Sequence, residues 1–278
     1  MTAATADQLH DHTVVILVEP QHPGNVGAAA RAMKNFGLGR LVLVNPPAWD
    51  PDTARWMAPG CGDVLAEARI VATLDEALEG VHVAVASTAR HRKQGQPVHE
   101  PARVCADLLD RAAQGHTTAL LFGREDFGLS TADVLRCASI LRIPTPEHAS
   151  LNLGQAVLLV AHGLFEEARR RGATFEGRML GGSRGQKTTR LASQPSPRDR
   201  TADLAQLEPA VEDVVGVLER VGYLRGVQPD KVRLTARQAL QTAGLPVRHV
   251  EALRGMAARI EWALDHPDAD WTKRRSDS

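Results

Sequence analysis

The chain has 278 residues, no formal net charge, 43% hydrophobic residues and only 4% aromatic residues. No apolar run reaches the roughly 18 residues of a membrane span, and Cys61, Cys105 and Cys137 are too scattered for a disulfide framework or a zinc site. We therefore expect a cytoplasmic protein with no membrane segment and no metal. The few aromatic residues also argue against a base-stacking surface of Phe, Tyr and Trp.

The zero net charge hides a basic segment. Residues 169–202 carry nine basic and two acidic side chains, whereas the chain as a whole is balanced. Such segregation suggests contact with a polyanion, although a solvated linker would have the same composition.

Strand and helix patterns alternate from the beginning of the chain. Strands are expected at 13–19, 40–45, 69–72, 81–87, 118–122 and 139–143, and helices at 26–36, 64–68, 74–78, 102–112, 131–136 and 153–171. The strands are apolar throughout rather than at every second residue. This pattern is typical of an α/β fold whose parallel sheet is covered on both faces.

We divide the chain into three parts. Residues 1–171 form the α/β domain, and residues 172–202, rich in Gly, Ser, Arg and Pro, form a basic flexible linker. Residues 203–278 form a helical C-terminal extension, with helices near 211–221, 231–242 and 246–264.

Ligands of open α/β sheets bind beyond the carboxyl ends of the strands. The loop that follows the first strand opens a segment, 22–37, in which Gly24 and Gly27 let the backbone turn and approach a ligand. Asn25 could bind substrate or could cap the helix, and Arg31 could reach a phosphate or ribose or could simply be solvated. The G-x-x-G spacing is not the dinucleotide-binding fingerprint.

Two later loops also follow buried strands. In the loop at 123–130, Glu125 could organise an arginine across a cleft, whereas Asp126 is best interpreted as an ordinary turn residue. In the loop at 144–152, the residues taken alone favour Ser150 as a helix N-cap and Asn152 as an ordinary first-turn residue.

Together, and in this order, the three segments resemble the signature motifs of the SpoU branch of the SPOUT methyltransferases over about residues 13–170. The matching residues are Asn25, Gly27, Ala30 and Arg31 in the first motif, Phe122, Gly123, Glu125, Gly128, Leu129 and Ser130 in the second, and Ile143, Pro144, Ser150, Leu151, Asn152 and Ala156 in the third.

The resemblance implies a parallel sheet with a C-terminal trefoil knot, S-adenosylmethionine as the cofactor, and a homodimer with active sites at its interface. Carried over by position, the cofactor-binding residues are Ser87, Thr88, Ala89, Arg90, Leu121, Phe122, Gly123, Ile143, Ser150, Leu151, Asn152 and Leu153.

The implied reaction is methyl transfer to a ribose 2′-hydroxyl of RNA, which needs no metal. Arg31 would hold the ribose and its phosphate and stabilise the developing alkoxide, because a guanidinium scarcely deprotonates. Asn25, Glu125, Ser150 and Asn152 would position the substrate, Arg31 and the cofactor.

The domain layout is similar to that of the TrmJ-type branch of the family, which methylates nucleotide 32 of the tRNA anticodon loop. The expected substrate is therefore tRNA, at a cytidine or uridine. The expected RNA-binding residues are Arg31, Arg90, Arg92, Lys93, Arg178, Arg184, Lys187 and Arg190.

Three alternatives stay open at this point. Ribosomal RNA would be the substrate if rRNA fragments, but not tRNA, accepted methyl groups. A non-catalytic RNA-binding protein would fail to bind S-adenosylmethionine. A Rossmann-type oxidoreductase is disfavoured by the missing fingerprint.

Overall fold

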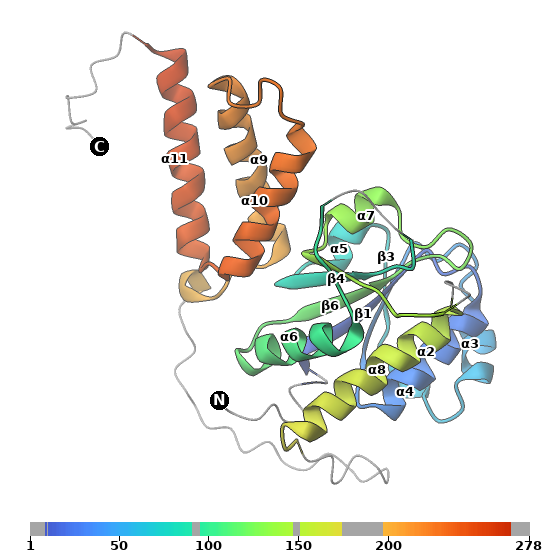
Figure 1. The fold of residues 1–278 in the computed structure, drawn as a ribbon. Helices are drawn as coiled ribbons and strands as arrows, with labels where there is room; N and C mark the ends of the chain where they lie inside the picture. The colour runs from blue at the N-terminus through green and yellow to red at the C-terminus, as the bar shows by residue number, and fades with distance from the viewer. Residues whose placement is uncertain (1–8, 10, 91–94, 147–150, 174–196, 268–278) are drawn as a thin grey trace. The chain divides into compact units, whose positions relative to one another are not determined.

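Figure 1 shows the computed structural model of the chain, which describes residues 9, 11–90, 95–146, 151–173 and 197–267. The chain divides into two compact units. The first comprises residues 1–194 with 203–205, and the second comprises 195–202 with 206–278. Within the described residues, no helix is both long and apolar enough to cross a membrane.

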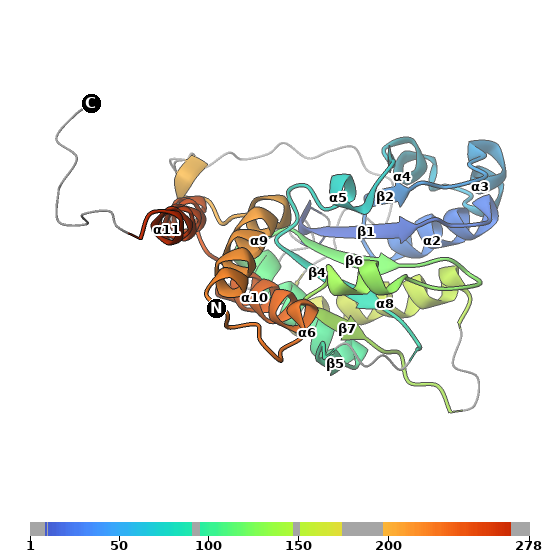
Figure 2. The ribbon, with the colours of Figure 1, turned by 90° about the horizontal axis from the view of Figure 1, so that it is seen from above.

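The first unit is built on a parallel seven-stranded sheet in the order β3-β2-β1-β6-β4-β7-β5. The strands are β1 (Thr13–Val18), β2 (Arg40–Val44), β3 (Arg69–Val71), β4 (Val83–Ser87), β5 (Val98–His99), β6 (Thr118–Phe122) and β7 (Ser139–Leu141). Every residue of β1 and β6 is buried, which explains why the central strands are apolar throughout. Figure 2 shows β1 and β6 side by side and running in the same direction. The predicted parallel α/β sheet is confirmed.

Helices cover both faces of the sheet. In Figure 1, α2 (Pro23–Asn35), α6 (Pro101–Ala113) and α8 (Leu153–Arg170) lie below the sheet, and α5 (Leu74–Ala77) and α7 (Thr131–Leu135) lie above it. Two short helices, α3 (Pro51–Met57) and α4 (Gly62–Ala66), join α2 on its face. Helix α2 packs against both α3 and α8, so it occupies the centre of this layer.

Gly27 has a structural role that differs from the one expected. It lies inside α2, and a Cβ there would meet the carbonyl oxygen of Ala54 in α3 at 2.1 Å. The glycine therefore allows two helix backbones to touch, rather than bringing the backbone close to a ligand.

The sequence pattern missed α3, β5 and a short 3₁₀ helix, η1 (Pro197–Asp199). Helix α3 buries only Ala54, so it has no apolar stripe to detect, and it starts instead at a cap in which the Asp50 carboxylate accepts from the Asp52 N–H. Strand β5 has only two residues, too few for a periodic signal.

The second unit contains α9 (Leu204–Arg220), α10 (Pro229–Ala243) and α11 (Val247–Asp265). Val211, Val215 and Leu224 form its small core. Helix α9 begins seven residues earlier than the sequence pattern indicates and contains Pro209, which removes only one helix hydrogen bond near its N-terminal end. Most of the expected linker, 174–196, lies outside the described residues.

Candidate functional site

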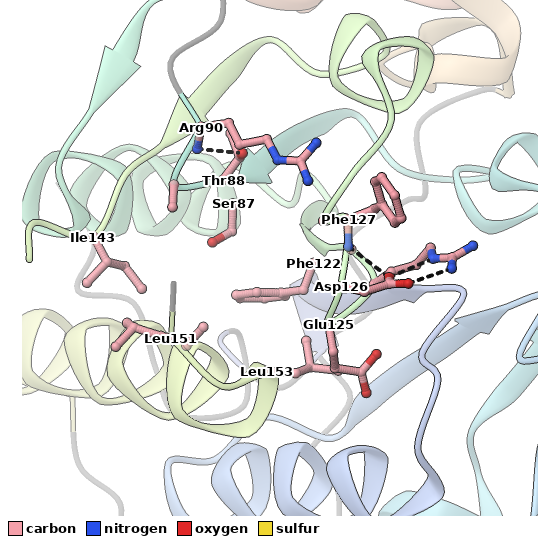
Figure 3. Close-up of a pocket in the computed structure, with 15 residues that line it drawn as sticks. Ser87, Thr88, Arg90, Phe122, Glu125, Asp126, Phe127, Ile143, Leu151 and Leu153 are labelled. Atoms are coloured by element: carbon pink, nitrogen blue, oxygen red, sulfur yellow. Dashed lines mark hydrogen bonds and ion pairs between the residues drawn. The ribbon is translucent and has the colours of Figure 1, made fainter. Parts of the chain in front are cut away.

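A cavity lies beyond the carboxyl ends of β4, β6 and β7, and the loops that follow β6 and β7 contribute to its walls (Figure 3). The described walls enclose about 210 Å³. They consist of Ser87, Thr88, Ala89, Arg90, Phe122, Gly123, Arg124, Glu125, Asp126, Phe127, Gly128, Ile143, Leu151, Leu153 and Ala156. This edge of a parallel sheet is where ligands of open α/β folds bind.

Most of the residues carried over as cofactor-binding line this cavity. They are Ser87, Thr88, Ala89, Arg90, Phe122, Gly123, Ile143, Leu151 and Leu153. Leu121 does not line it, because its side chain is fully buried within β6. Asn152 caps the adjacent helix instead, and Ser150 lies outside the described residues.

The loop after β6 folds back on itself. The Gly128 N–H donates to the Arg124 carbonyl at 2.8 Å, and the two residues form an isolated antiparallel bridge. Gly123 makes this turn possible, because a Cβ at that position would lie 2.1 Å from the Leu129 backbone nitrogen. The turn presents Glu125, Asp126 and Phe127 at its tip, and Figure 3 shows all three beside the cavity.

A chain of hydrogen bonds joins the three motifs at one side of the cavity. The side-chain amide nitrogen of Asn25 donates to the Glu125 carboxylate at 2.7 Å, and that of Asn152 donates to the side-chain oxygen of Asn25 at 3.0 Å. The side-chain oxygen of Asn152 in turn accepts from the backbone N–H of Gly154 at 2.9 Å. Each of the two side-chain amides accepts through its oxygen and donates through its nitrogen. All hydrogen bonds of this series therefore point in one direction, from Gly154 toward Glu125.

Glu125 also fixes the loop between β1 and α2. Its carboxylate accepts from the Gln21 N–H at 2.8 Å and from the His22 N–H at 3.3 Å. Partial burial alone would raise the pKa of Glu125, but the hydrogen bonds from Asn25 and from the backbone outweigh it and lower the pKa. The carboxylate is therefore ionised at neutral pH, and it accepts three hydrogen bonds from its own chain.

The structure corrects three local expectations. Asn25 is not an N-cap, because α2 begins at Pro23 after His22, and Asn25 lies in the first turn. The N-cap of α8 is Asn152 rather than Ser150, since Asn152 accepts from two backbone N–H groups. Within its own chain, Glu125 binds Asn25 and two backbone amides, and no described arginine binds it.

Asp126 is a turn residue, as expected. It pairs with Arg124 at 2.8 Å and accepts from the Phe127 N–H at 2.7 Å. The hydrogen bond from Arg124 lowers the pKa of Asp126 to about 2.

We expect Asn25→Asp to destabilise the fold at pH 7.5 more than Asn25→Ala does. Alanine removes hydrogen bonds and should cost about 1–3 kcal/mol, whereas aspartate also sets a carboxylate against Glu125. Mutual repulsion raises the pKa of one of the two carboxyls, so protonation restores a donor as the pH falls. Urea unfolding at pH 7.5 and pH 5 should show a gap between the two variants that narrows at the lower pH. A gap of equal size at both pH values would contradict this account.

The structure does not bring Arg31 into the cavity, and Asn25, Leu121 and Asn152 are likewise absent from its lining. The Arg31 side chain is exposed on α2. Within the described part of the chain, no hydrogen bond or ion pair holds its guanidinium. Arg90 lies at the cavity, whereas Arg92, Lys93, Arg178, Arg184, Lys187 and Arg190 are outside the described residues.

Sequence reasoning missed the contributions of Arg124 and Phe127. Arg124 pairs with Glu19 at 3.2 Å as well as with Asp126, which ties the loop after β6 to the end of β1. Phe127 is 62% exposed beside the cavity. The sequence signal for Phe127 was that it is a large apolar residue in an otherwise charged turn.

These features define a ligand site built from three sequence motifs, and the comparison with known families identifies it. The SpoU rRNA methylase family matches residues 12–162 of this chain. The chain belongs to this family of RNA methylases.

Individual relatives show which members of the family this chain is similar to. A tRNA (cytidine/uridine-2′-O-)-methyltransferase TrmJ from Yersinia enterocolitica is 34% identical over 91% of this chain and 93% of its own length. The TrmJ of Pseudomonas aeruginosa, named for cytidine, uridine and adenosine, is 33% identical over 90% and 94%. The crystal structure of TrmJ from Z. mobilis superimposes with a TM-score of 0.67 at 30% identity, covering 90% of this chain and 99% of that one.

Proposed function

We propose that this protein transfers a methyl group from S-adenosylmethionine to a ribose 2′-hydroxyl of tRNA, at a cytidine or uridine. One observation carries the proposal: Glu125 of the second motif lines the cavity, and Asn25 and Asn152 of the other two motifs join it in a single series of hydrogen bonds. The TrmJ relatives that span nine-tenths of the chain support the substrate class.

The cavity fits the chemistry of the cofactor. Phe122, Ile143, Leu151 and Leu153 offer apolar surfaces to the adenine ring, and the backbone at Gly123 is free of a side chain (Figure 3). When bound, S-adenosylmethionine supplies a methyl group already activated by its sulfonium. We further propose that the C-terminal part of the first unit forms the trefoil knot of the family around this cavity.

The residues of the chain then have to orient the ribose and manage its proton. The chain of hydrogen bonds from Glu125 through Asn25 to Asn152 holds the first turn of α2 against the start of α8. We assign to these residues, with Ser150, the positioning of the substrate and cofactor. Arg31 would hold the ribose and its phosphate and stabilise the developing alkoxide.

The position of Arg31 leads us to propose a homodimer. Six residues along α2 separate Asn25 from Arg31 by about 9 Å along the helix axis and by about 240° around it. Asn25 is bound to Glu125 at the edge of the cavity, so a straight α2 directs the Arg31 side chain away from that edge. In a homodimer, Arg31 would instead serve the cavity of the partner subunit.

Exposed apolar side chains on the two helices beside α2 support a subunit interface on this face. Trp56 and Met57 on α3 and Leu158 and Leu159 on α8 are 40–87% exposed, and both helices pack against α2. Exposed apolar groups on the helices that flank α2 are typical of the core of a subunit interface.

We propose nucleotide 32 of the anticodon loop as the target. With tRNA as its substrate, we expect the protein to act in the cytoplasm. Phosphate contacts are assigned to Arg90, Arg92 and Lys93 and to the basic segment with Arg178, Arg184, Lys187 and Arg190.

The test is transfer of labelled methyl groups to unmodified tRNA transcripts, one of which carries a 2′-deoxyribose at nucleotide 32. Incorporation that disappears with the deoxy substitution supports the reaction, the substrate and the position together. Incorporation that survives it overturns the position alone. Incorporation into ribosomal RNA fragments but not into tRNA overturns the substrate.

A further inference from the structure

A second cavity adjoins the proposed cofactor cavity on the same edge of the sheet. It has a volume of about 440 Å³, within the range of about 300–1,000 Å³ that is typical of ligand sites. The two cavities share Arg90, Arg124, Phe127 and Gly128. The other lining residues are Val18, Glu19, Val44, Asn45, Ala72, Thr73, Leu74, Leu129, Ser130, Thr131 and Asp133.

The backbone at this cavity is strained. Glu19 and Asn45, the residues that follow β1 and β2, have φ angles of 48° and 43°. This left-handed conformation costs a non-glycine residue free energy, and it persists only where the surroundings impose it. Here both residues still donate to the neighbouring strand, Glu19 to Val44 and Asn45 to Val71, each at 2.8 Å. Such strain in a cavity wall is a recurring feature of functional sites.

Phe127 is the main exposed apolar surface on the wall between the cavities. The guanidinium carbon of Arg90 and that of Arg124 each lie 5.7 Å from the centre of its ring. Arg124 is fixed by Glu19 and Asp126, whereas no other described residue binds the Arg90 side chain through a hydrogen bond or an ion pair. The wall therefore offers a flat ring and one cation that can turn toward a ligand.

The charges of the second cavity favour a neutral ligand. Two basic residues, Arg90 and Arg124, and two acidic residues, Glu19 and Asp133, line it, so its formal charge is balanced. A phosphate site would need an excess of positive charge or several free backbone donors. Asn45, Thr73, Ser130 and Thr131 add polar groups that can donate or accept hydrogen bonds.

We propose that the second cavity binds the base of the nucleotide being methylated, with Phe127 as its stacking surface. This inference rests on the proposed function. A ribose at the shared wall would have its 2′-hydroxyl toward the cofactor cavity and its base in the second cavity. Stacking on a π-face does not depend on the pattern of donors and acceptors, so cytidine and uridine would both be accepted.

The test replaces Phe127 with alanine, leucine and tyrosine in the full-length protein. Stacking of one base corresponds to a loss of about 5- to 150-fold in affinity when the aromatic ring is removed. We therefore expect Phe127→Ala and Phe127→Leu to raise KM for tRNA at least fivefold and Phe127→Tyr to keep it within about twofold. Because Phe127 also lines the cofactor cavity, the affinity for S-adenosylmethionine is measured by calorimetry as well, and the rise in KM for tRNA should exceed any loss of that affinity in the alanine and leucine variants. Leucine is the matched control, since it retains apolar bulk but has no ring.

A double-mutant cycle identifies the stacked base. The second partner is an anticodon stem-loop with an abasic ribose, its 2′-hydroxyl intact, at the methylated position. If Phe127 stacks on that base, the abasic substrate should weaken the wild-type protein but not weaken Phe127→Ala further. Losses that add, or a leucine variant as active as the tyrosine variant, would overturn the proposal.

A readout without turnover separates this proposal from the proposed function. A pyrrolo-cytidine placed at nucleotide 32 should lose fluorescence on stacking against the wild-type protein and should lose less against Phe127→Ala. Equal quenching by both proteins would overturn the role of Phe127, whether or not methyl groups are transferred. A wild-type protein that quenches the probe but transfers no methyl group would instead overturn the proposed function alone.

Discussion

Replacing Arg31 with alanine is expected to lower the rate of methyl transfer by about 100- to 1,000-fold, as the loss of one alkoxide-stabilising donor does in other enzymes. The affinity for S-adenosylmethionine should stay unchanged, because Arg31 does not line the cavity. Single-turnover transfer to tRNA and calorimetry with the cofactor measure the two quantities separately. Near-normal turnover in Arg31→Ala would overturn the assignment.

Subunit mixing tests whether Arg31 acts on the partner's cavity. Arg31→Ala subunits are combined with subunits whose own cofactor cavity is disabled by Gly123→Ala. If Arg31 acts across the interface, a hybrid dimer contains one site with an intact cavity and an intact Arg31, so the mixture should recover activity that neither variant has alone. If Arg31 acts within its own chain, the same hybrid has no complete site, and the mixture should stay inactive.

Gly123→Ala is expected to reduce cofactor affinity by about 100-fold and to lower the melting temperature. The new Cβ would lie 2.1 Å from the Leu129 nitrogen and 2.2 Å from the Gly128 carbonyl carbon. Both are backbone atoms, so the loop itself has to move, and overpacking of this kind costs about 1–3 kcal/mol. A displacement of about 1 Å in a site that depends on geometry is enough for the expected loss.

Gly128→Ala is the matched control for that prediction. Its φ of 64° strains an alanine, but a Cβ there would meet no atom within 4 Å. We expect a stability loss of about 1–2 kcal/mol from the left-handed backbone and a much smaller loss of cofactor affinity. Calorimetric binding and thermal unfolding of both variants check this difference. Equal losses of affinity would show that steric contact at Gly123 is not the cause.

The apolar strands and the turn residues between them were enough to predict the sheet. Residues 14–18 and 119–122 are buried on both faces and are all apolar, and this pattern predicted a parallel sheet. Short elements with little buried surface, such as α3, left no such pattern. The motif residues were also identified from the sequence, because their spacing resembles that of a known family.

What the sequence determined by itself was therefore the fold class, the family and the identity of the residues Asn25, Glu125 and Asn152 as a group. Only the tertiary structure decided which of them touch: Asn25 and Glu125 are a hundred positions apart, and the parallel pairing of β1 with β6 brings the loops that carry them together. It also placed Arg31 outside the cavity of its own chain and brought the guanidinium groups of Arg90 and Arg124 near the Phe127 ring. The physical reason is that hydrogen bonds and ring contacts depend on the separation of atoms in space, whereas a sequence pattern reports only local periodicity and burial.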